Sequence, residues 1–271
     1  MEQHGQNPKK SVIAVIPARL ASTRLVTKML RDIGGKPLIL HTLDSARRAR
    51  SVSRVIVATD AAEIFDIVTR SGGEAMMTSP EHRSGSDRVA EVAADMPDGS
   101  LIINVQGDEP LISGETIDRT VHALLNDDEA QMSSTYSLIT EKAELFDPNV
   151  VKAVVGENGY AMYFSRSPVP FPRDAALAFD NDLEKAVEAM PEMLSQFKRH
   201  TGLYVYRREF LLQMTAMPQT VTENTEMLEQ LRALENGAKI KLVEAKETSI
   251  GVDTQKDLDA VAKILASSDR V

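Results

Sequence analysis

Charged and hydroxyl side chains are concentrated between residues 17 and 30, PARLASTRLVTKML, directly after a short apolar run. Its three cations are Arg19, Arg24 and Lys28, and Ser22 and Thr23 place hydroxyls between the two arginines. An arginine presents a planar fork to a phosphate or carboxylate, and a lysine presents a mobile point charge, so this segment could cradle a polyanion. The alternative is a solvated loop whose charges are incidental. The chain has neither a P-loop pattern nor a GxGxxG pattern, which leaves dinucleotide binding unsupported.

Two acidic motifs at distant points of the chain could serve one metal ion. VQGDEP places Asp108 and Glu109 after a glycine at the end of an apolar run, and GVDT contributes Asp253. Mg²⁺ takes about six oxygen ligands and is usually bound by one or two carboxylates together with substrate phosphates. Taken alone, the first motif could equally be an exposed acidic turn. Asp253 could equally belong to the cap of a helix that Thr254 opens.

A glycine-serine loop, HRSGSDR at residues 82–88, has cations at both ends. Such a loop can contact a nucleobase and a ribose through its backbone groups. The alternative is a flexible linker.

Three later motifs carry polar side chains of less specific meaning. TENTEMLEQLRALENG, residues 222–237, predicts one helix on which Glu226 and Gln230 are four residues apart and share a face. The neighbouring apolar stripe could be simple core packing. His200 in RHTGLYVY could be a structural histidine, and Arg166 in YFSR could form a surface ion pair.

The first half of the chain alternates between apolar runs and amphipathic segments. SVIAVIPAR, RVIVATD, EAMMTS and LIINVQGDEP, which begin at residues 11, 54, 74 and 101, are typical of buried strands. Helices are expected after them, one of them over 61–71 with a capping box formed by Asp60 and Glu63. This alternation predicts an α/β fold with a mostly parallel central sheet and helices on both faces. Ligands of such sheets lie beyond the carboxyl ends of the strands, where the polar motifs fall.

The second half of the chain has a different pattern. The ranges 131–140, 150–155, 160–166 and 202–207 are strand-like, and 173–198 is acidic, rich in methionine and weakly helical. We expect a smaller strand-rich lobe over about 131–215 inside a single domain of residues 11–271, with residues 1–10 as a mobile tail.

Composition narrows the class of protein. The 271 residues are 42% hydrophobic and 26% charged, which indicates a globular chain. A net charge of −9 disfavours a nucleic-acid partner, and the absence of cysteine excludes disulfides and thiol chemistry. The first ten residues lack the apolar run of a signal peptide, and no apolar stretch reaches about 18 residues, so we expect no membrane segment and a cytoplasmic location.

Eight motifs together resemble one family, 3-deoxy-manno-octulosonate cytidylyltransferase, in the family's order and over about residues 11–265. They are IPARLASTRL, HRSGSDRVAEV, INVQGDEP, DPNVVKAVV, YFSRSPVP, RHTGLYVYR, EMLEQLR and GVDTQKDL. The resemblance implies a Rossmann-like nucleotidyltransferase fold, similar to GT-A, whose lobe serves sugar binding and dimerisation. It also implies transfer of CMP from CTP to 3-deoxy-manno-octulosonate (KDO) with release of pyrophosphate, Mg²⁺ as cofactor, a homodimer, and a role in lipopolysaccharide biosynthesis.

The same resemblance implies roles for individual residues. Nucleotide binding falls to Ala18, Arg19, Lys28, Arg83, Ser84, Gly85, Gln106 and Asp108. Sugar binding falls to Arg24, Gln106, Arg166, His200, Tyr204, Glu226 and Gln230. The metal ligands are Asp108 and Asp253, and the catalytic set is Arg19, Lys28, Asp108 and Asp253.

One departure from the family pattern falls in the first loop. Members of the family usually read LPGKPL where this chain has LVTKML, so Val26 and Thr27 replace Pro and Gly before Lys28. Loss of the glycine removes easy access to positive φ, which predicts a different path or greater mobility for the loop.

Several alternatives remain open at this point. The sugar acid could be an amino analogue such as 8-amino-KDO, or another acid such as neuraminic acid, and one or two metal ions could serve the site. More distant alternatives are a polyol phosphate cytidylyltransferase, a metal-dependent glycosyltransferase and a catalytically silent nucleotide-binding protein.

Overall fold

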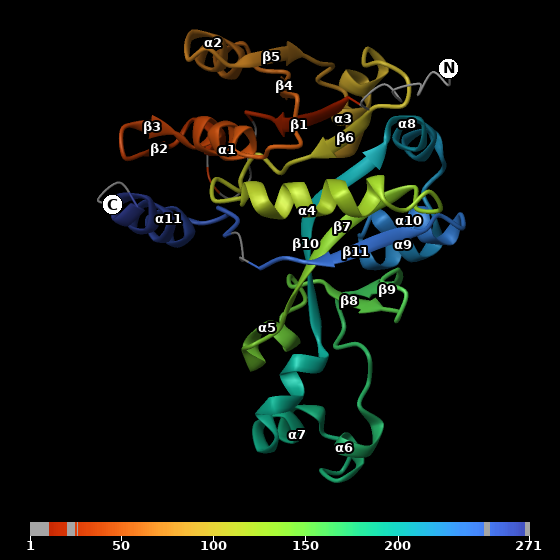
Figure 1. Ribbon diagram of the computed structural model, residues 1–271. Coiled ribbons are helices and arrows are strands. Elements are labelled where there is room, and N and C mark those ends of the chain that lie inside the picture. The colour runs from red at the N-terminus through yellow and green to blue at the C-terminus, as the bar shows by residue number, and fades with distance from the viewer. Residues whose placement is uncertain (1–10, 21–24, 26, 247–249, 269–271) are drawn as a thin grey trace, which may run out of the picture. The chain divides into compact units, whose positions relative to one another are not determined.

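A computed structural model describes residues 11–20, 25, 27–246 and 250–268 (Figure 1). The chain forms two compact units. The first consists of Met1–Val121, Val205–Thr215 and Ser249–Val271, and the second of His122–Tyr204 and Ala216–Thr248. The tail expected at residues 1–10 lies outside the described residues.

In the first unit, strands β6, β1, β4 and β5 lie side by side in that order and run parallel. Their bounds are β1 Val12–Ala18, β4 Arg54–Thr59, β5 Glu74–Met77 and β6 Leu101–Asn104. Val15 of β1 pairs with Ile56 on one side and with Asn104 on the other. Every residue from 12 to 16 is buried, and because successive side chains point to opposite faces, both faces of β1 are covered. The predicted α/β fold with a mostly parallel sheet is confirmed.

Seven helices lie wholly or mostly in the first unit, among the residues that the structure describes. They are η1 Lys28–Leu30, α1 Leu38–Arg47, α2 Ala62–Arg70, α3 Gly85–Ala94, α4 Gly114–Leu125, α8 Arg208–Ala216 and α11 Gln255–Ser268, with the short pair β2 Asp32–Ile33 and β3 Lys36–Pro37 before α1. The expected capping box at the start of α2 is wrong. Ala61 is the N-cap of α2 without a side-chain bond, because the carboxylate of Asp60 accepts instead from Arg88, at 2.8 Å.

The second unit has a mixed sheet. Its strands are β7 Met132–Leu138, β8 Lys152–Val155, β9 Ala161–Ser165, most of β10 Lys198–Arg207, and β11 Ile240–Glu244. β11 is parallel to β7, whereas β8 is antiparallel to both β9 and β10.

The range 173–198 of the second unit folds into short helices, as expected. The helices that flank or make up this range are α5 Lys142–Phe146, α6 Arg173–Leu177, α7 Leu183–Ala189 and η2 Pro191–Gln196. A buried apolar cluster joins α5, α7 and η2: Ile139, Leu145, Val187, Leu194 and Phe197.

The single helix predicted over 222–237 is wrong. The segment forms α9, Val221–Glu226, and α10, Gln230–Glu235, separated at Met227, whose φ of 52° and ψ of 48° are left-handed. Glu226 therefore ends one helix and Gln230 begins the next, so the two do not share one helical face. Part of the cause is Glu223, whose carboxylate completes the capping box of α9 and also accepts from Arg232 Nε at 2.8 Å.

Candidate functional site

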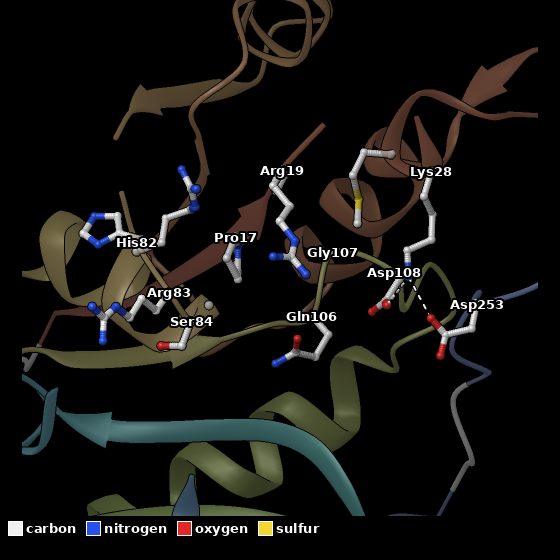
Figure 2. Close-up of a pocket in the computed structure, with 14 residues that line it drawn as sticks. Pro17, Arg19, Lys28, His82, Arg83, Ser84, Gln106, Gly107, Asp108 and Asp253 are labelled. Carbon is white, nitrogen blue, oxygen red and sulfur yellow. Dashed lines mark hydrogen bonds and ion pairs between the residues drawn. The ribbon is translucent and has the colours of Figure 1, made fainter. Parts of the chain in front are cut away.

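A pocket of about 370 Å³ lies in the first unit at the carboxyl ends of β1 and β6 (Figure 2). Residues that line it come from these strand ends, η1, the start of α3 and the segment before α11. The lining contains the nine residues that sequence analysis assigned to the nucleotide or the metal: Ala18, Arg19, Lys28, Arg83, Ser84, Gly85, Gln106, Asp108 and Asp253. The structure thus brings the whole set together, and the individual roles stay predictions.

Two carboxylates from distant parts of the chain meet around one ammonium group. Lys28 Nζ lies 2.7 Å from Asp108 Oδ2 and 3.0 Å from Asp253 Oδ1 (Figure 2). The lysine side chain is 11% exposed, against 28% for Asp108 and 41% for Asp253. Burial acts to lower the pKa of Lys28, but the charges and hydrogen bonds of the two carboxylates outweigh it, so the pKa is raised. The group is a charged clamp rather than an exposed acidic turn.

Helix α1 fixes the loop that carries Asp108. Thr42 Oγ1 donates to the carbonyl oxygen of Gly107 at 2.8 Å, and Ser45 Oγ donates to that of Pro110 at 2.7 Å. A Cβ at position 107 would lie 2.9 Å from the backbone oxygen of Pro17, so only glycine fits where this loop crosses β1. The carboxylate is consequently held by backbone that has little freedom.

A backbone bond brings Asp253 to the same place. The amide of Val252 donates to the carbonyl oxygen of Asp108 at 2.9 Å. Thr254 and Asp257 cap α11 reciprocally: Thr254 Oγ1 accepts from the amide of Asp257 at 3.3 Å, and the Asp257 carboxylate accepts from the amides of Thr254 at 2.8 Å and of Asp253 at 3.2 Å. The Asp253 carboxylate is therefore not the cap of the helix and is directed to Lys28 instead.

The start of α3 forms an ordered wall of the pocket. Ser84 Oγ accepts from the amide of Asp87 at 3.0 Å, and the Asp87 carboxylate accepts from the amide of Ser84 at 3.1 Å. This capping box excludes the flexible-linker alternative for the core of the loop. A ten-residue helix whose first residue, Gly85, lines the pocket presents the positive end of its dipole to a bound anion.

Arg88 is a pocket residue to which sequence analysis gave no role. It is 4% exposed, its Nη2 donates to Asp60 Oδ2 at 2.8 Å, and its Nη1 bonds the hydroxyl of Thr78. The side chain thereby ties the ends of β4 and β5 to α3. The only sequence signal was its place as the second cation of the HRSGSDR loop.

Arg19 differs from Arg88 because it is exposed, and no hydrogen bond or ion pair joins its guanidinium to another described residue. Figure 2 shows its side chain among those that line the pocket. Because its guanidinium has no such contact, Arg19 can bind an entering phosphate without first breaking a bond to another described residue.

The acidic pair fits a magnesium ion. Hard carboxylate oxygens are the protein donors that Mg²⁺ takes, usually one or two of them, with water and phosphate oxygens completing the set. The Lys28 ammonium already shows that a cation is stable between Asp108 and Asp253. Within the described ranges there is no group of three or more histidine, cysteine, aspartate or glutamate side chains that could hold a metal without such help.

The residues assigned to the sugar acid fall mainly in the second unit. His200, Tyr204, Arg166, Glu226 and Gln230 belong to it. Gln106 lines the pocket of the first unit, and Arg24 lies outside the described residues.

His200 is held by ring contacts and by one hydroxyl. Its ring centroid lies 4.7 Å from that of Phe164 and 5.3 Å from that of Tyr204. Its Nε2 lies 2.8 Å from Ser134 Oγ, whose single proton is directed to the carbonyl oxygen of Leu203 at 2.7 Å. The hydroxyl must then accept from Nε2–H, which leaves Nδ1 as an acceptor. Burial lowers the pKa of His200 to about 3, so the ring is neutral at pH 7.

Arg166 and Glu226 form a lock between the end of β9 and the end of α9. Arg166 donates from Nε to the carbonyl oxygen of Glu226 at 2.6 Å, from Nη1 to that of Pro148 at 2.7 Å and from Nη2 to that of Met227 at 3.4 Å. The Glu226 carboxylate accepts from Ser165 Oγ at 2.7 Å and from the amide of Arg166 at 2.9 Å. Both charged groups are largely engaged within the protein.

Lys152 supports this lock and was missed by the sequence analysis. It is completely buried on β8, and its Nζ donates to the carbonyl oxygens of Val150 at 2.7 Å and Asp147 at 3.0 Å. Burial lowers the pKa of this lysine. It thus fixes the turn whose Pro148 carbonyl binds Arg166. A lysine inside the apolar run VVKAVV was the signal that could have found it.

Comparisons with known proteins point to one reaction. The cytidylyltransferase family profile matches residues 13–240. A 3-deoxy-manno-octulosonate cytidylyltransferase of Trichlorobacter lovleyi is 49% identical over 248 residues, covering 92% of this chain and 96% of that protein. The enzyme of the same name from Geobacter sulfurreducens is 47% identical over 255 residues, covering 94% of this chain and 99% of that protein.

Solved structures agree with the sequence relatives. CMP:2-keto-3-deoxy-manno-octonic acid synthetase complexed with CTP matches with a TM-score of 0.84 and 35% identity, covering 96% of this chain and 100% of that one. A 4-diphosphocytidyl-2C-methyl-D-erythritol synthase from Anaerococcus prevotii shares the fold, with a TM-score of 0.59, 18% identity, and coverage of 95% of this chain and 99% of that one.

Proposed function

We propose residue roles for a chain that belongs to the 3-deoxy-manno-octulosonate cytidylyltransferase family and transfers CMP from CTP to KDO. The first unit binds the magnesium nucleotide, and the second unit supplies side chains that bind the sugar acid. The division rests on the charges described above, since the pocket of the first unit is lined by cations and carboxylates whereas the second unit gathers neutral rings and engaged charges.

In the first unit, the triphosphate binds against Arg19, Lys28 and the start of α3. Arg19 is exposed in the pocket, and Ser84 and Gly85 offer a helix N-terminus to an anion. Asp108 and Asp253 would hold Mg²⁺, which when bound neutralises phosphate charge and lowers the pKa of the attacking hydroxyl.

The transfer forms one bond and breaks one. The anomeric hydroxyl oxygen of the sugar acid bonds to the α-phosphorus of CTP, its proton leaves, and the bond to the pyrophosphate oxygen breaks in line with the attack. Such displacements depend on positioning and on charge stabilisation rather than on a protein nucleophile. Arg19 and Lys28 stabilise the negative charge that develops on pyrophosphate.

In the second unit, neutral His200 accepts a hydrogen bond from a sugar hydroxyl at Nδ1, and Tyr204 and Gln230 are further sugar-binding side chains. Ser134 fixes the tautomer that makes Nδ1 an acceptor. Arg166 acts as a positioning residue, because its guanidinium already donates to three backbone carbonyl oxygens.

The convergence of Asp108 and Asp253 on one cation inside the pocket carries the proposal. Pyrophosphate release should be measured from CTP, UTP and ATP against KDO, 8-amino-KDO and neuraminic acid, with Mg²⁺ and with EDTA. We expect turnover with CTP and KDO that EDTA abolishes and Mg²⁺ restores. Full activity in EDTA would contradict the metal site. A preference for 8-amino-KDO or neuraminic acid would reassign the sugar, and CTP binding without turnover on any acid would indicate a silent nucleotide-binding protein.

A homodimer and a cytoplasmic location complete the proposal. The second unit exposes large apolar side chains, among them Met162 at 67%, Val221 at 79% and Met227 at 74%, which are suited to an interface between two copies. Sedimentation equilibrium of the Val221→Lys and Met162→Glu variants tests this, with a shift toward monomer expected. No helix in the described ranges has the length and hydrophobicity needed to cross a bilayer. CTP is a cytoplasmic substrate, and the activated sugar would be consumed in lipopolysaccharide biosynthesis.

A further inference from the structure

We propose that Lys28 is a built-in competitor of the metal ion, holding the Asp108–Asp253 pair in the nucleotide-free enzyme and releasing it when the nucleotide enters. This inference rests on the proposed metal site and adds a step that the metal site alone does not require. It makes metal binding conditional on a new partner for the lysine.

The contacts of Lys28 place its ammonium where a shared cation would lie. Nζ is 2.7 Å from Asp108 Oδ2 and 3.0 Å from Asp253 Oδ1, so the lysine binds one oxygen of each carboxylate. A magnesium ion binds carboxylate oxygens at about 2.0–2.1 Å and would have to use the same pair. The two cations would then be a few ångströms apart, where their repulsion is strong in a partly buried site.

The exposure of the three side chains indicates from which side a metal ion would replace the Lys28 ammonium. Lys28 is the least exposed member of the group, and the carboxylates open toward the pocket. A metal ion arriving from the pocket therefore meets carboxylates whose charge the lysine already neutralises in part. The metal ion interacts with the full negative charge of the two carboxylates only after the lysine has moved away.

The nucleotide supplies the reason for Lys28 to leave. Its phosphates enter a pocket lined by Lys28, Arg19 and the start of α3, and they offer the ammonium a new set of anionic oxygens. Metal and nucleotide should therefore bind with positive coupling, because each favours the state in which Lys28 has left the carboxylates. An enzyme of this design binds free divalent cations weakly.

Mn²⁺ binding to the nucleotide-free protein tests the inference without measuring turnover. The free Mn²⁺ signal in electron paramagnetic resonance would give the Kd of the wild type, Lys28→Gln and Lys28→Met. We expect both variants to bind Mn²⁺ about tenfold tighter than the wild type or more, since they remove the competing ammonium. Circular dichroism would show that both variants are folded.

Arg19→Gln is the matched control. It removes the same charge from the same pocket, but Arg19 makes no contact with the two carboxylates among the described residues. We expect its Mn²⁺ affinity to change by less than about threefold, as for the loss of a nearby but separate charge. An equal gain in Arg19→Gln and Lys28→Gln would overturn direct competition and leave a general field effect.

Two further outcomes separate this inference from the proposed metal site. If Lys28→Gln binds Mn²⁺ no tighter than a wild type that already binds it well, the competition is overturned while the carboxylate site stands. If Lys28→Gln gains affinity and the Lys28→Gln, Asp108→Asn double variant keeps that gain, Asp108 is not a ligand and both proposals fall. Loss of the gain in the double variant supports both.

Discussion

The two groups of functional side chains, in the first and in the second unit, satisfy their charges in different ways. In the first, Arg19 is exposed and Lys28 bridges two partly exposed carboxylates, so the charges are available to a ligand. In the second, Arg166 donates to three carbonyl oxygens, and Glu226 accepts hydrogen bonds from Ser165 and from the amide of Arg166, so most of the charge is satisfied within the protein. The first group is suited to a polyanion and its metal, and the second to a ligand recognised through hydroxyl groups and shape.

The largest effect is expected from Asp108→Asn in the charged pocket. Loss of one of the two proposed metal ligands should reduce kcat by about 10³-fold or more, which corresponds to about 4 kcal/mol of transition-state stabilisation. The fold should remain intact, because the side chain is 28% exposed. Pyrophosphate release measures the first effect and urea unfolding the second.

Asp66→Asn provides the control for this change. Asp66 forms an exposed ion pair with Arg70 on α2, away from the pocket lining, and its loss should leave kcat within about twofold. Near-normal activity of Asp108→Asn would remove the metal assignment and with it the contrast between the two groups.

The next effect concerns Arg166 in the second unit. Arg166→Ala and Arg166→Lys should both destabilise the protein by about 2–3 kcal/mol, because a single ammonium cannot replace a guanidinium that reaches carbonyl oxygens of residues 148, 226 and 227. Both should raise the KM for KDO by about tenfold and change that for CTP by less than about threefold.

The lysine variant decides between positioning and direct contact. If Arg166→Lys restores a nearly normal KM for KDO while Arg166→Ala does not, positive charge at this position binds the sugar carboxylate directly. The second group would then resemble the first more than its hydrogen bonds indicate.

Sequence patterns predicted more of the arrangement of the first group than of the second. The rule that parallel strands end at one edge of a sheet is enough to bring Arg19 after β1 and Asp108 after β6 into one pocket. Asp253 could not be placed in this way, because its approach depends on the bond between the Val252 amide and the Asp108 carbonyl oxygen, 144 residues away in the chain. That pairing came from the family resemblance.

The second group was misjudged where distant contacts decide local structure. Helical periodicity over 222–237 is genuine, yet the helix breaks at Met227, whose carbonyl oxygen accepts from Arg166, 61 residues earlier. No local pattern contains that contact. Lys152 is a different case, because its partners, the carbonyl oxygens of Asp147 and Val150, are only five and two residues away in the chain. The strand-like pattern of residues 150–155 does not show that the preceding turn directs these oxygens at the lysine.

A smaller effect is expected in the second group, where His200 should make the free energy of unfolding depend on pH. His200 has a pKa of about 3 in the folded protein and 6.5 as its ordinary value, so below pH 6.5 the unfolded chain takes up a proton that the folded chain does not. Burial of the neutral ring therefore leaves the free energy of unfolding undiminished above pH 6.5. As the pH falls toward 3, the free energy of unfolding decreases, because protonation favours the unfolded chain. Between pH 7.5 and pH 5 the loss is about 2 kcal/mol.

Urea unfolding of the wild type and His200→Gln at both pH values measures this difference. The variant should lose about 2 kcal/mol less than the wild type, whereas His122→Gln, which removes an exposed histidine, should follow the wild type. Equal losses in the wild type and His200→Gln would mean that His200 is protonated in the folded state. The second group would then carry a positive charge available to the sugar acid.

The smallest effect compares one left-handed residue from each group. Thr27, before Lys28, has φ 51° and ψ 37°, and Met227 has φ 52° and ψ 48°. A left-handed conformation costs roughly 1–2 kcal/mol and is worst for a β-branched residue, while a glycine adds about 0.5–1 kcal/mol of unfolded-state entropy. Thr27→Gly should therefore raise the Tm by about 1–3 °C, and Met227→Gly by less, in differential scanning calorimetry. Thr27→Gly should also speed the exchange of Lys28 for Mn²⁺ if strain in this loop helps to hold the lysine. A lower Tm for Thr27→Gly would show that the side-chain contacts of Thr27 outweigh the backbone strain.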